Sequence, residues 1–191
     1  MFDIVVVTTK KRKSLITEHL NGIEYTISIT PDYDLPKDFK PTVTTLTYNH
    51  LGTYRCFRGH QDAIAKATKD YVLVLEDDAV PNCQNWYEII YENLFLMNIF
   101  DMISFHGRGY DRNHFDSVSN SNAYKFIRPK NSLVWVVAAL AYVIGRKDYE
   151  RIKNFVYDGT PWDMLLYRNF DYCLIEESPF NHDRSEGSLV D

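Results

Sequence analysis

The stretch YVLVLEDD at residues 71–78 constrains this chain more than any other feature. It begins as the continuous apolar run of a buried strand and ends in three adjacent carboxylates, Glu76, Asp77 and Asp78. Adjacent like charges repel unless a positive group lies between them, and open α/β sheets bind ligands beyond the carboxyl ends of their strands. The stretch therefore predicts a divalent cation with a phosphorylated ligand. Oxygen ligands favour Mg²⁺ or Mn²⁺ over zinc.

The composition is that of one globular domain. The chain has 191 residues and is 45% hydrophobic, which is enough for one core and little more. Its three cysteines are odd in number and form no CxxC pair, so a disulfide framework or a zinc site is not expected, and a reducing, cytoplasmic location is. The N-terminal pattern is not that of a secretory signal, and the longest apolar segment, 133–145, is too short to span a bilayer.

Charge is unevenly distributed along the chain. The net charge is −5, yet residues 108–130 hold five basic and two acidic side chains with aromatic residues between them. Such a segment can bind a polyanion or a sugar, or it can be a solvated loop with a few core anchors.

The order of apolar periods predicts an α/β domain with a largely parallel sheet and right-handed crossovers. A long loop is expected at 107–122 and an irregular tail at 177–191. Strands are predicted at 2–8, 24–29, 42–47, 71–78, 102–106, 123–128, 134–144 and 172–175, and helices at 14–20, 54–69, 85–97, 147–155 and 161–168. No P-loop, glycine-rich dinucleotide fingerprint or nucleophile elbow is present in the sequence.

Two blocks resemble a known family. The run GHQDAIAKATKDYVLVLEDDAVP at 59–81 resembles the acidic block of glycosyltransferase family 25, the lipooligosaccharide and collagen galactosyltransferases, and AYVIGRKDYERI at 141–152 is similar to that family's later strand and helix. Gly59 stands where the family has serine. The resemblance implies a single-domain GT-A (Rossmann-like) fold, with a mixed, mostly parallel sheet flanked by helices. It also implies a nucleotide-sugar donor, UDP-linked by expectation, and Mn²⁺ or Mg²⁺.

The resemblance also assigns roles at the acidic strand end. Asp78 is the expected metal ligand, Glu76 faces the metal or the ribose, and Asp77 lies between them. A C-terminal histidine often completes such a metal site, which makes His182 a candidate, although a histidine in a tail is also a common surface residue. Asp163 is the candidate general base, or else it caps its helix in a Thr-x-x-Asp arrangement that starts at Thr160.

Other residues are expected to hold the donor. Thr8, Thr9 and Arg12 follow the first strand, where this fold binds its nucleotide, and Asp32 and Arg58 are candidates for contacts to base, ribose or phosphate. Each of them can equally be a solvated side chain. His60 lies on the apolar stripe of its helix, which favours a hydrogen-bonded core histidine over a ligand.

The function that the resemblance implies is metal-dependent transfer of a sugar to a hydroxyl group. Inversion is favoured, and retention stays open because retaining enzymes share the same metal motif. The acceptor is a surface saccharide or a hydroxylated or hydroxymethylated base in DNA, and no obligate protein partner is inferred. Two alternatives remain open: a metal-dependent nuclease or phosphohydrolase that uses the same carboxylates, and a non-catalytic sugar-nucleotide-binding module.

Overall fold

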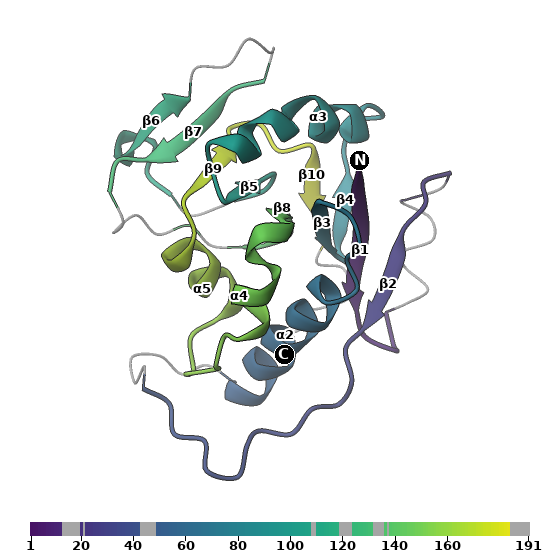
Figure 1. Cartoon of the computed structure of the whole chain (residues 1–191), viewed down its shortest axis with the longest axis vertical. Coiled ribbons are helices and arrows are strands. Elements are labelled where there is room, and N and C mark those ends of the chain that lie inside the picture. Colours follow the sequence, from purple (N-terminus) through teal and green to yellow (C-terminus); the bar gives the residue numbers. More distant parts are fainter. Residues whose placement is uncertain are drawn as a thin grey trace.

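The computed structural model describes residues 1–12, 20, 22–42, 49–107, 110–118, 124–131, 136 and 138–183. Strands and helices alternate along most of this length (Figure 1). The elements are β1 (Phe2–Thr8), β2 (Thr26–Ile29), α2 (His50–Ile64), β3 (Tyr71–Glu76), β4 (Ala79–Pro81), α3 (Trp86–Asn93), η2 (Leu94–Asn98), β5 (Met102–Ser104), η3 (Arg112–His114), β6 (Phe115–Val118), β7 (Phe126–Pro129), β8 (Ala141–Gly145), η4 (Arg146–Asp148), α4 (Tyr149–Lys153), α5 (Trp162–Asn169), β9 (Tyr172–Ile175) and β10 (Phe180–His182).

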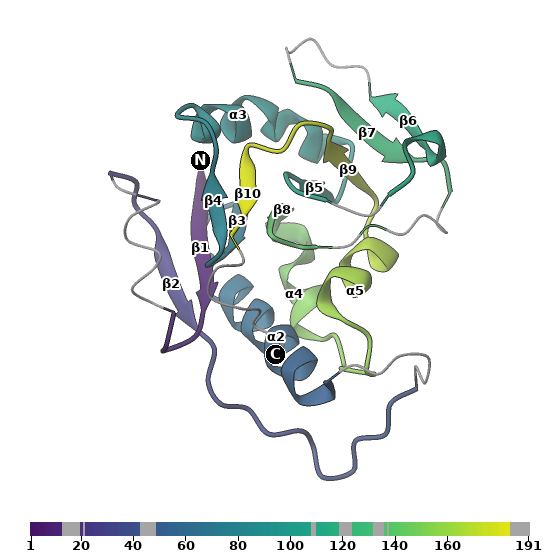
Figure 2. The same ribbon diagram turned by 180° about the vertical axis from the view of Figure 1, so that it is seen from behind.

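One mixed sheet organises the molecule. Its eight strands lie in the order β2-β1-β3-β8-β5-β9-β7-β6, and a separate pair joins β4 to β10 (Figure 2). Strands β2, β1 and β3 are parallel, as are β5 and β9, whereas β8 is antiparallel to both β3 and β5. Strand β7 is antiparallel to β9 and β6. The predicted α/β class, a mixed sheet flanked by helices, is therefore confirmed.

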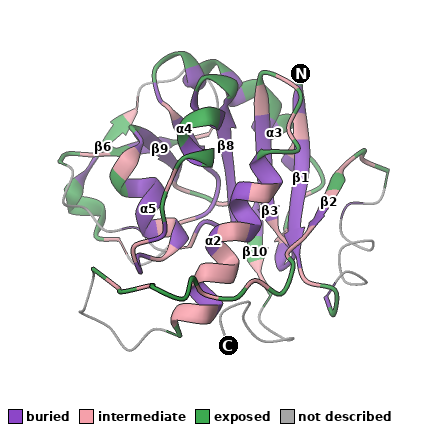
Figure 3. Cartoon of the chain, turned by 60° about the horizontal axis from the view of Figure 1, so that its bottom comes forward, coloured by how far each residue is buried: buried purple, intermediate pink, exposed green. Residues whose placement is uncertain are grey.

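Side chains that alternate along the central strands fill two cores. Ile4 and Val6 of β1 face the core beneath α3 and η2, while Val5 and Val7 face the core beneath α2, α4 and α5. Strand β3 alternates in the same way. Because both faces are covered, these strands are apolar throughout, which is why the sequence predicts them as continuous runs. Figure 3 shows β1, β3 and β8 buried along nearly their whole length.

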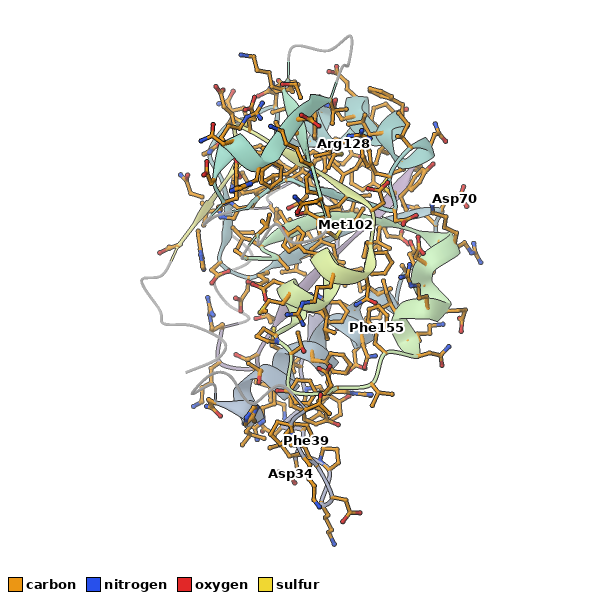
Figure 4. All side chains as sticks on the ribbon, turned by 90° about the vertical axis from the view of Figure 1, so that its left-hand side faces the viewer. Asp34, Phe39, Asp70, Met102, Arg128 and Phe155 are labelled. Carbon is orange, nitrogen blue, oxygen red and sulfur yellow. The ribbon has the colours of Figure 1, made fainter. Side chains whose placement is uncertain are left out.

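Helix α2 lies between the sheet and an extended segment that follows β2. Asn49 caps the helix, because its side chain accepts a hydrogen bond from the Gly52 backbone N–H at 3.2 Å. The helix thus begins four residues before the predicted start at 54, and it ends at Ile64. In the extended segment, Figure 4 shows Asp34 and Phe39 at the end of the molecule opposite Arg128.

Gly59 lets α2 approach the end of β2 closely. A Cβ atom at this position would lie 2.3 Å from Thr30 Oγ1 and 3.3 Å from Thr30 Cβ. The serine that the family resemblance leads one to expect would meet the same obstacle. Glycine is therefore required here by packing, at the cost of lower helix propensity.

Gly59→Ala is expected to lower the free energy of unfolding by about 1–2 kcal/mol, because overpacking outweighs the gain in helix propensity. Urea denaturation of the variant and of the wild type measures the change. In a Thr30→Ala background the same substitution should cost little or stabilise the protein. An equal loss in both backgrounds would show that Thr30 is not the obstacle.

Several predicted boundaries are wrong, and the physical reason is pairing between distant segments. The expected loop at 107–122 contains η3 and β6, and the expected irregular tail at 177–191 contains β10. Strand β4 was not predicted. These strands have three or four residues each, and β6 and β10 carry polar side chains, so pairing with β7, β10 and β4 makes them strands.

Other predicted elements end early or lie elsewhere. The helix expected at 85–97 is α3 followed by the 3₁₀ turn η2, and the one expected at 147–155 is η4 followed by α4. Within the described residues, the strand expected at 134–144 is found as β8, while 136 and 138–140 are not in a strand. The helix predicted at 14–20 and the strand predicted at 42–47 fall almost wholly outside the described residues. Within the described part of the chain, no helix is both long and apolar enough to cross a bilayer.

Candidate functional site

Strand register brings together side chains from three distant segments at the carboxyl end of β3. Strand β1 is parallel to β3 with Val7 opposite Glu76, so the next residue, Thr8, lies beside Asp77. Strand β10 is antiparallel to β4 with His182 opposite Ala79, so His182 lies beside Asp78. The turn that follows β1 adds Arg12.

These side chains are in direct contact. Thr8 Oγ1 donates a hydrogen bond to Asp77 Oδ2 at 2.6 Å. Arg12 Nη2 lies 3.0 Å from Asp77 Oδ1 and 3.4 Å from Asp78 Oδ2, and His182 Nε2 lies 3.0 Å from Asp78 Oδ2. Asp77, Asp78 and Arg12 are all buried, at 4%, 5% and 8% exposure. A buried carboxylate pair of this kind needs a cation, and Arg12 supplies one.

The carboxylates differ in proton affinity. Burial raises the pKa of Asp77 to about 6, against the opposing effects of Thr8 and Arg12. Burial and the charge of Glu76 raise the pKa of Asp78, while His182 and Arg12 oppose the shift. Burial also acts to raise the pKa of Glu76, but the hydrogen bond from His60 and the nearby positive charge of Arg12 act against it, and this pKa is lowered. Negative charge is therefore retained most firmly on Glu76.

Besides the ion contacts given above, four buried polar atoms of the site form no hydrogen bond within the described part of the chain. They are Asp77 Oδ1, Asp78 Oδ1 and the Nε and Nη1 atoms of Arg12. Buried polar groups are nearly always paired, so each unpaired one requires an explanation. Two acceptors and two donors at the same site are the complement that a cation and an anionic ligand would satisfy.

His60 is the core histidine that its position on the apolar stripe predicts. It is fully buried and stacks on Trp162 with the ring centroids 5.2 Å apart. The Trp162 indole N–H donates to Tyr142 Oη at 3.0 Å, and Tyr142 Oη lies 2.8 Å from His60 Nδ1. When the Tyr142 hydroxyl donates to Nδ1, the ring carries its proton on Nε2, which lies 3.2 Å from Glu76 Oε1. The chain of hydrogen bonds thus fixes the orientation of Glu76.

Asp163 does not form the predicted Thr160 capping arrangement. Helix α5 begins at Trp162 with Pro161 at the N-cap position. Asp163 Oδ1 accepts a hydrogen bond from the Met164 N–H at 2.8 Å, and its Oδ2 accepts one from the Ala138 N–H at 2.9 Å. Ala138 has φ = 78°, a left-handed conformation that is unfavourable for alanine. Asp163 therefore holds a strained turn just before β8, and burial raises its pKa.

Asp163→Ala is expected to lower the free energy of unfolding by about 1–3 kcal/mol, because the Ala138 N–H loses its acceptor. Asp163→Asn should cost less, since the amide oxygen can still accept that hydrogen bond. Thermal or urea unfolding of both variants tests this. Equal losses would mean that the Ala138 contact contributes nothing.

The remaining predicted residues lie apart from the carboxylates or at their margin. Asp32 is largely exposed and lies 3.9 Å from Arg55, while Arg58 pairs with Asp62 at 3.8 Å and lies over the Tyr33 ring. These contacts fasten the extended segment after β2 to α2. Thr9 is half-buried, and its carbonyl oxygen accepts hydrogen bonds from Thr8 Oγ1 and from the Arg12 N–H.

His106 is a residue of this region that the sequence did not single out. Its Nδ1 lies 3.0 Å from Ser178 Oγ and 3.3 Å from the Phe180 carbonyl oxygen, and its ring centroid lies 6.3 Å from that of His182. A carbonyl oxygen only accepts, so Nδ1 carries the proton. His106 thus holds the turn that delivers β10 to the site. The one signal for His106 in the sequence is its position just beyond the carboxyl end of β5, where open α/β sheets bind ligands.

A cavity of about 460 Å³ lies elsewhere, at the amino end of β1. Its lining includes Phe2, Asp3, Tyr25 and Tyr87, and none of the residues named above for the site. The acidic, basic and histidine side chains of the candidate site therefore lie at the carboxyl end of β3, away from this cavity.

The fold and geometry define an α/β protein with an acidic, arginine- and histidine-lined site at the end of a central strand. No protein-family model and no curated protein matches the chain. Among solved structures it is similar to HddC from Yersinia pseudotuberculosis, with a TM-score of 0.39 and 12% identity over 90% of this chain and 67% of that one. HddC complexed with GMP-PN gives a TM-score of 0.40 and 10% identity over 89% and 67%. Similarity at this TM-score and identity does not indicate a function.

Proposed function

We propose that this protein is a GT-A-type glycosyltransferase that moves a sugar from a nucleotide-sugar donor, UDP-linked by expectation, to a hydroxyl acceptor with Mn²⁺ or Mg²⁺. The observation that carries the proposal is the contact between His182 and Asp78, 104 residues apart in sequence and 3.0 Å apart in space. A tail histidine that meets the last acid of the strand-end triplet is what the family resemblance leads one to expect.

The residues present fit a divalent cation. Asp78 Oδ1 is buried without a hydrogen-bond partner in the described part of the chain, and the carboxylate and imidazole donors of Asp78 and His182 suit Mn²⁺. Asp78 and His182 would hold the ion, with Glu76 as the neighbouring carboxylate. When bound, the ion would act as a Lewis acid that stabilises negative charge on the leaving diphosphate.

The other groups of the site would act on the donor and the acceptor. The Nε and Nη1 atoms of Arg12 are buried donors suited to phosphate oxygens, and Thr8 and Thr9 border the same strand end. Asp163 would accept the proton of the acceptor hydroxyl, since burial raises its pKa and therefore its affinity for a proton. Its carboxylate oxygens each keep a lone pair beyond the one used by the backbone.

For the acceptor we favour a saccharide over DNA. In the basic segment at 108–130, Arg112 pairs with Glu176 and Lys130 lies 3.9 Å from Asp116, so local acids engage two of its basic side chains. Added salt distinguishes the two acceptors. Transfer to DNA would fall steeply with salt because phosphate contacts release counterions, whereas transfer to a neutral saccharide would hardly change.

The test is incubation of the purified protein with individual nucleotide sugars and Mn²⁺, with and without EDTA, while nucleoside diphosphate and inorganic phosphate are measured. Diphosphate release that requires both the metal and a sugar nucleotide supports the proposal. Phosphate release without sugar-dependent diphosphate would indicate a phosphohydrolase. Binding of the sugar nucleotide without any turnover would indicate a binding module, and neither binding nor turnover would overturn the proposal.

A further inference from the structure

A second group of metal-ligand side chains lies next to the carboxylate site. Cys56 and His60 are one turn apart on the same side of α2, and Glu76 lies at the end of β3, which packs against that helix. One ligand atom from each of the three lies within 4.8 Å of the other two. This is the one such group of three in the described residues.

The donor set is that of a thiophilic cation. Thiolate, imidazole and carboxylate are the ligands of Zn²⁺, at about 2.0–2.3 Å from the ion, so tetrahedral neighbours lie about 3.5 Å apart. The three side chains must therefore close by roughly 1 Å, which small side-chain rotations provide. Three protein ligands leave a fourth position open, as in zinc sites that bind water or a small ligand.

The surroundings of His60 already resemble those of a metal-bound histidine. Ligating histidines are oriented by a hydrogen bond to their second ring nitrogen. Tyr142 Oη lies 2.8 Å from His60 Nδ1, and the stacked Trp162 ring holds the imidazole plane. A tyrosine hydroxyl can donate or accept, so it orients the ring in either tautomer. His60 Nε2, now directed at Glu76, is the nitrogen that would bind the ion.

The local charge favours a cation as well. Burial and the negative charges of Glu76, Asp163 and Asp78 raise the pKa of the Cys56 thiol well above its usual value. Without a metal the thiol is therefore largely protonated and reacts slowly. The same negative field attracts a divalent ion, whose charge compensates for thiolate formation.

We infer that Cys56, His60 and Glu76 form a binding site for a thiophilic divalent cation of the Zn²⁺ class, separate from the Asp78–His182 pair. On binding, the Cys56 S–H bond breaks, its proton leaves to solvent and a sulfur–metal bond forms. The neutral imidazole moves its proton from Nε2 to Nδ1, and no group is oxidised or reduced. One proton is released for each ion bound.

Zinc bound by Cys56, His60 and Glu76 would affect the neighbouring Asp78–His182 site. Zinc would take both Glu76 and His60 out of their mutual hydrogen bond, so it should inhibit the glycosyl transfer proposed above. This consequence depends on the proposed function, whereas cation binding does not.

Titration of the reduced protein with Co²⁺, followed by absorption, tests the site. Coordination by Cys56 should produce a thiolate-to-cobalt charge-transfer band in the near ultraviolet. Cys56→Ser should abolish the band, while Cys83→Ser, a matched change at the other half-exposed cysteine, should retain it. Asp78→Asn should also retain it, because that carboxylate belongs to the other pair.

Protection from alkylation provides a readout that needs no variant. Zn²⁺ should slow iodoacetamide modification of Cys56 at least about tenfold and leave Cys83 unchanged, as quantified by peptide mass spectrometry. Folded protein that gives no thiolate band, or a band that survives Cys56→Ser, would overturn the inference. So would equal alkylation of Cys56 with and without zinc. A failure of the sugar-nucleotide assay would leave these results unaffected.

Discussion

The Asp78→Asn variant is expected to lose at least about 100-fold of its metal-dependent turnover while it keeps its fold. Loss of residues that merely support a metal ligand typically costs 10–100-fold, so loss of a direct ligand should cost at least as much. Asn is isosteric with Asp but lacks its charge. Because Asp78 is a buried carboxylate close to Glu76, the substitution also removes repulsion, and the variant should be no less stable than the wild type.

His182→Gln should reduce the same turnover and raise the Mn²⁺ concentration needed for half-maximal rate. Asp116→Asn and His114→Gln are matched controls, since both side chains are exposed, at 57% and 62%, on a different part of the sheet. Rates measured over a range of Mn²⁺ concentrations distinguish metal affinity from turnover. Wild-type rates for Asp78→Asn would remove the strand-end acids from the proposed mechanism.

The Arg12→Met variant is expected to lose about 3–5 kcal/mol of stability at neutral pH, as when one partner of a buried ion pair is deleted. Among the described residues, Arg12 is the basic side chain that lies within 4 Å of both Asp77 and Asp78. Without it, the two buried carboxylates would keep Thr8 and His182 as their partners within the described part of the chain. Methionine has a similar length and apolar stem, so lost packing contributes little.

The loss should depend on pH, with a sign that follows from the raised pKa of Asp77. The folded-state pKa is about 6 and the ordinary value 3.8, so the folded protein binds the proton more tightly and its stability falls as pH rises through this interval. Removing Arg12 raises the folded pKa further and extends the fall to higher pH. The difference between variant and wild type should therefore be larger at about pH 7.5 than at about pH 5.

Urea denaturation at both pH values measures this difference. Lys11→Met removes an exposed positive charge from the same turn and should change stability by less than about 0.5 kcal/mol at either pH. If Arg12→Met lost the same free energy at both pH values, the carboxylates would not be the source of the penalty.

The elements that the sequence predicts well are those with a strong local signal. Strands β1, β3 and β9 are continuous apolar runs, and their bounds agree with prediction to within two residues. The buried state of His60 followed from its place on an apolar stripe. Strands β4, β6 and β10 were missed because each is short and its conformation depends on pairing with another segment, which for β4 and β10 lies far away in sequence.

In the site, too, single residues could be predicted from local patterns, whereas their contacts with distant segments could not. The sequence singled out Asp78, Arg12 and His182 individually, but it did not predict that Arg12 would neutralise Asp77 and Asp78. The capping arrangement considered as the alternative role of Asp163 is wrong, because its partner, the N–H of Ala138, lies 25 residues away. The cysteine count argues against zinc, and spacing rules do not detect the ligand set inferred above, which is divided between a helix and a strand.

By itself, the sequence determined the α/β class and the end of the strand where charge accumulates, because a run of apolar residues followed by three acids is a local pattern. The tertiary structure decided which groups neutralise those acids. That outcome depends on the parallel register of β1 with β3 and on the antiparallel pairing of β10 with β4. Register is set by packing across the whole sheet, so no local stretch of sequence contains it.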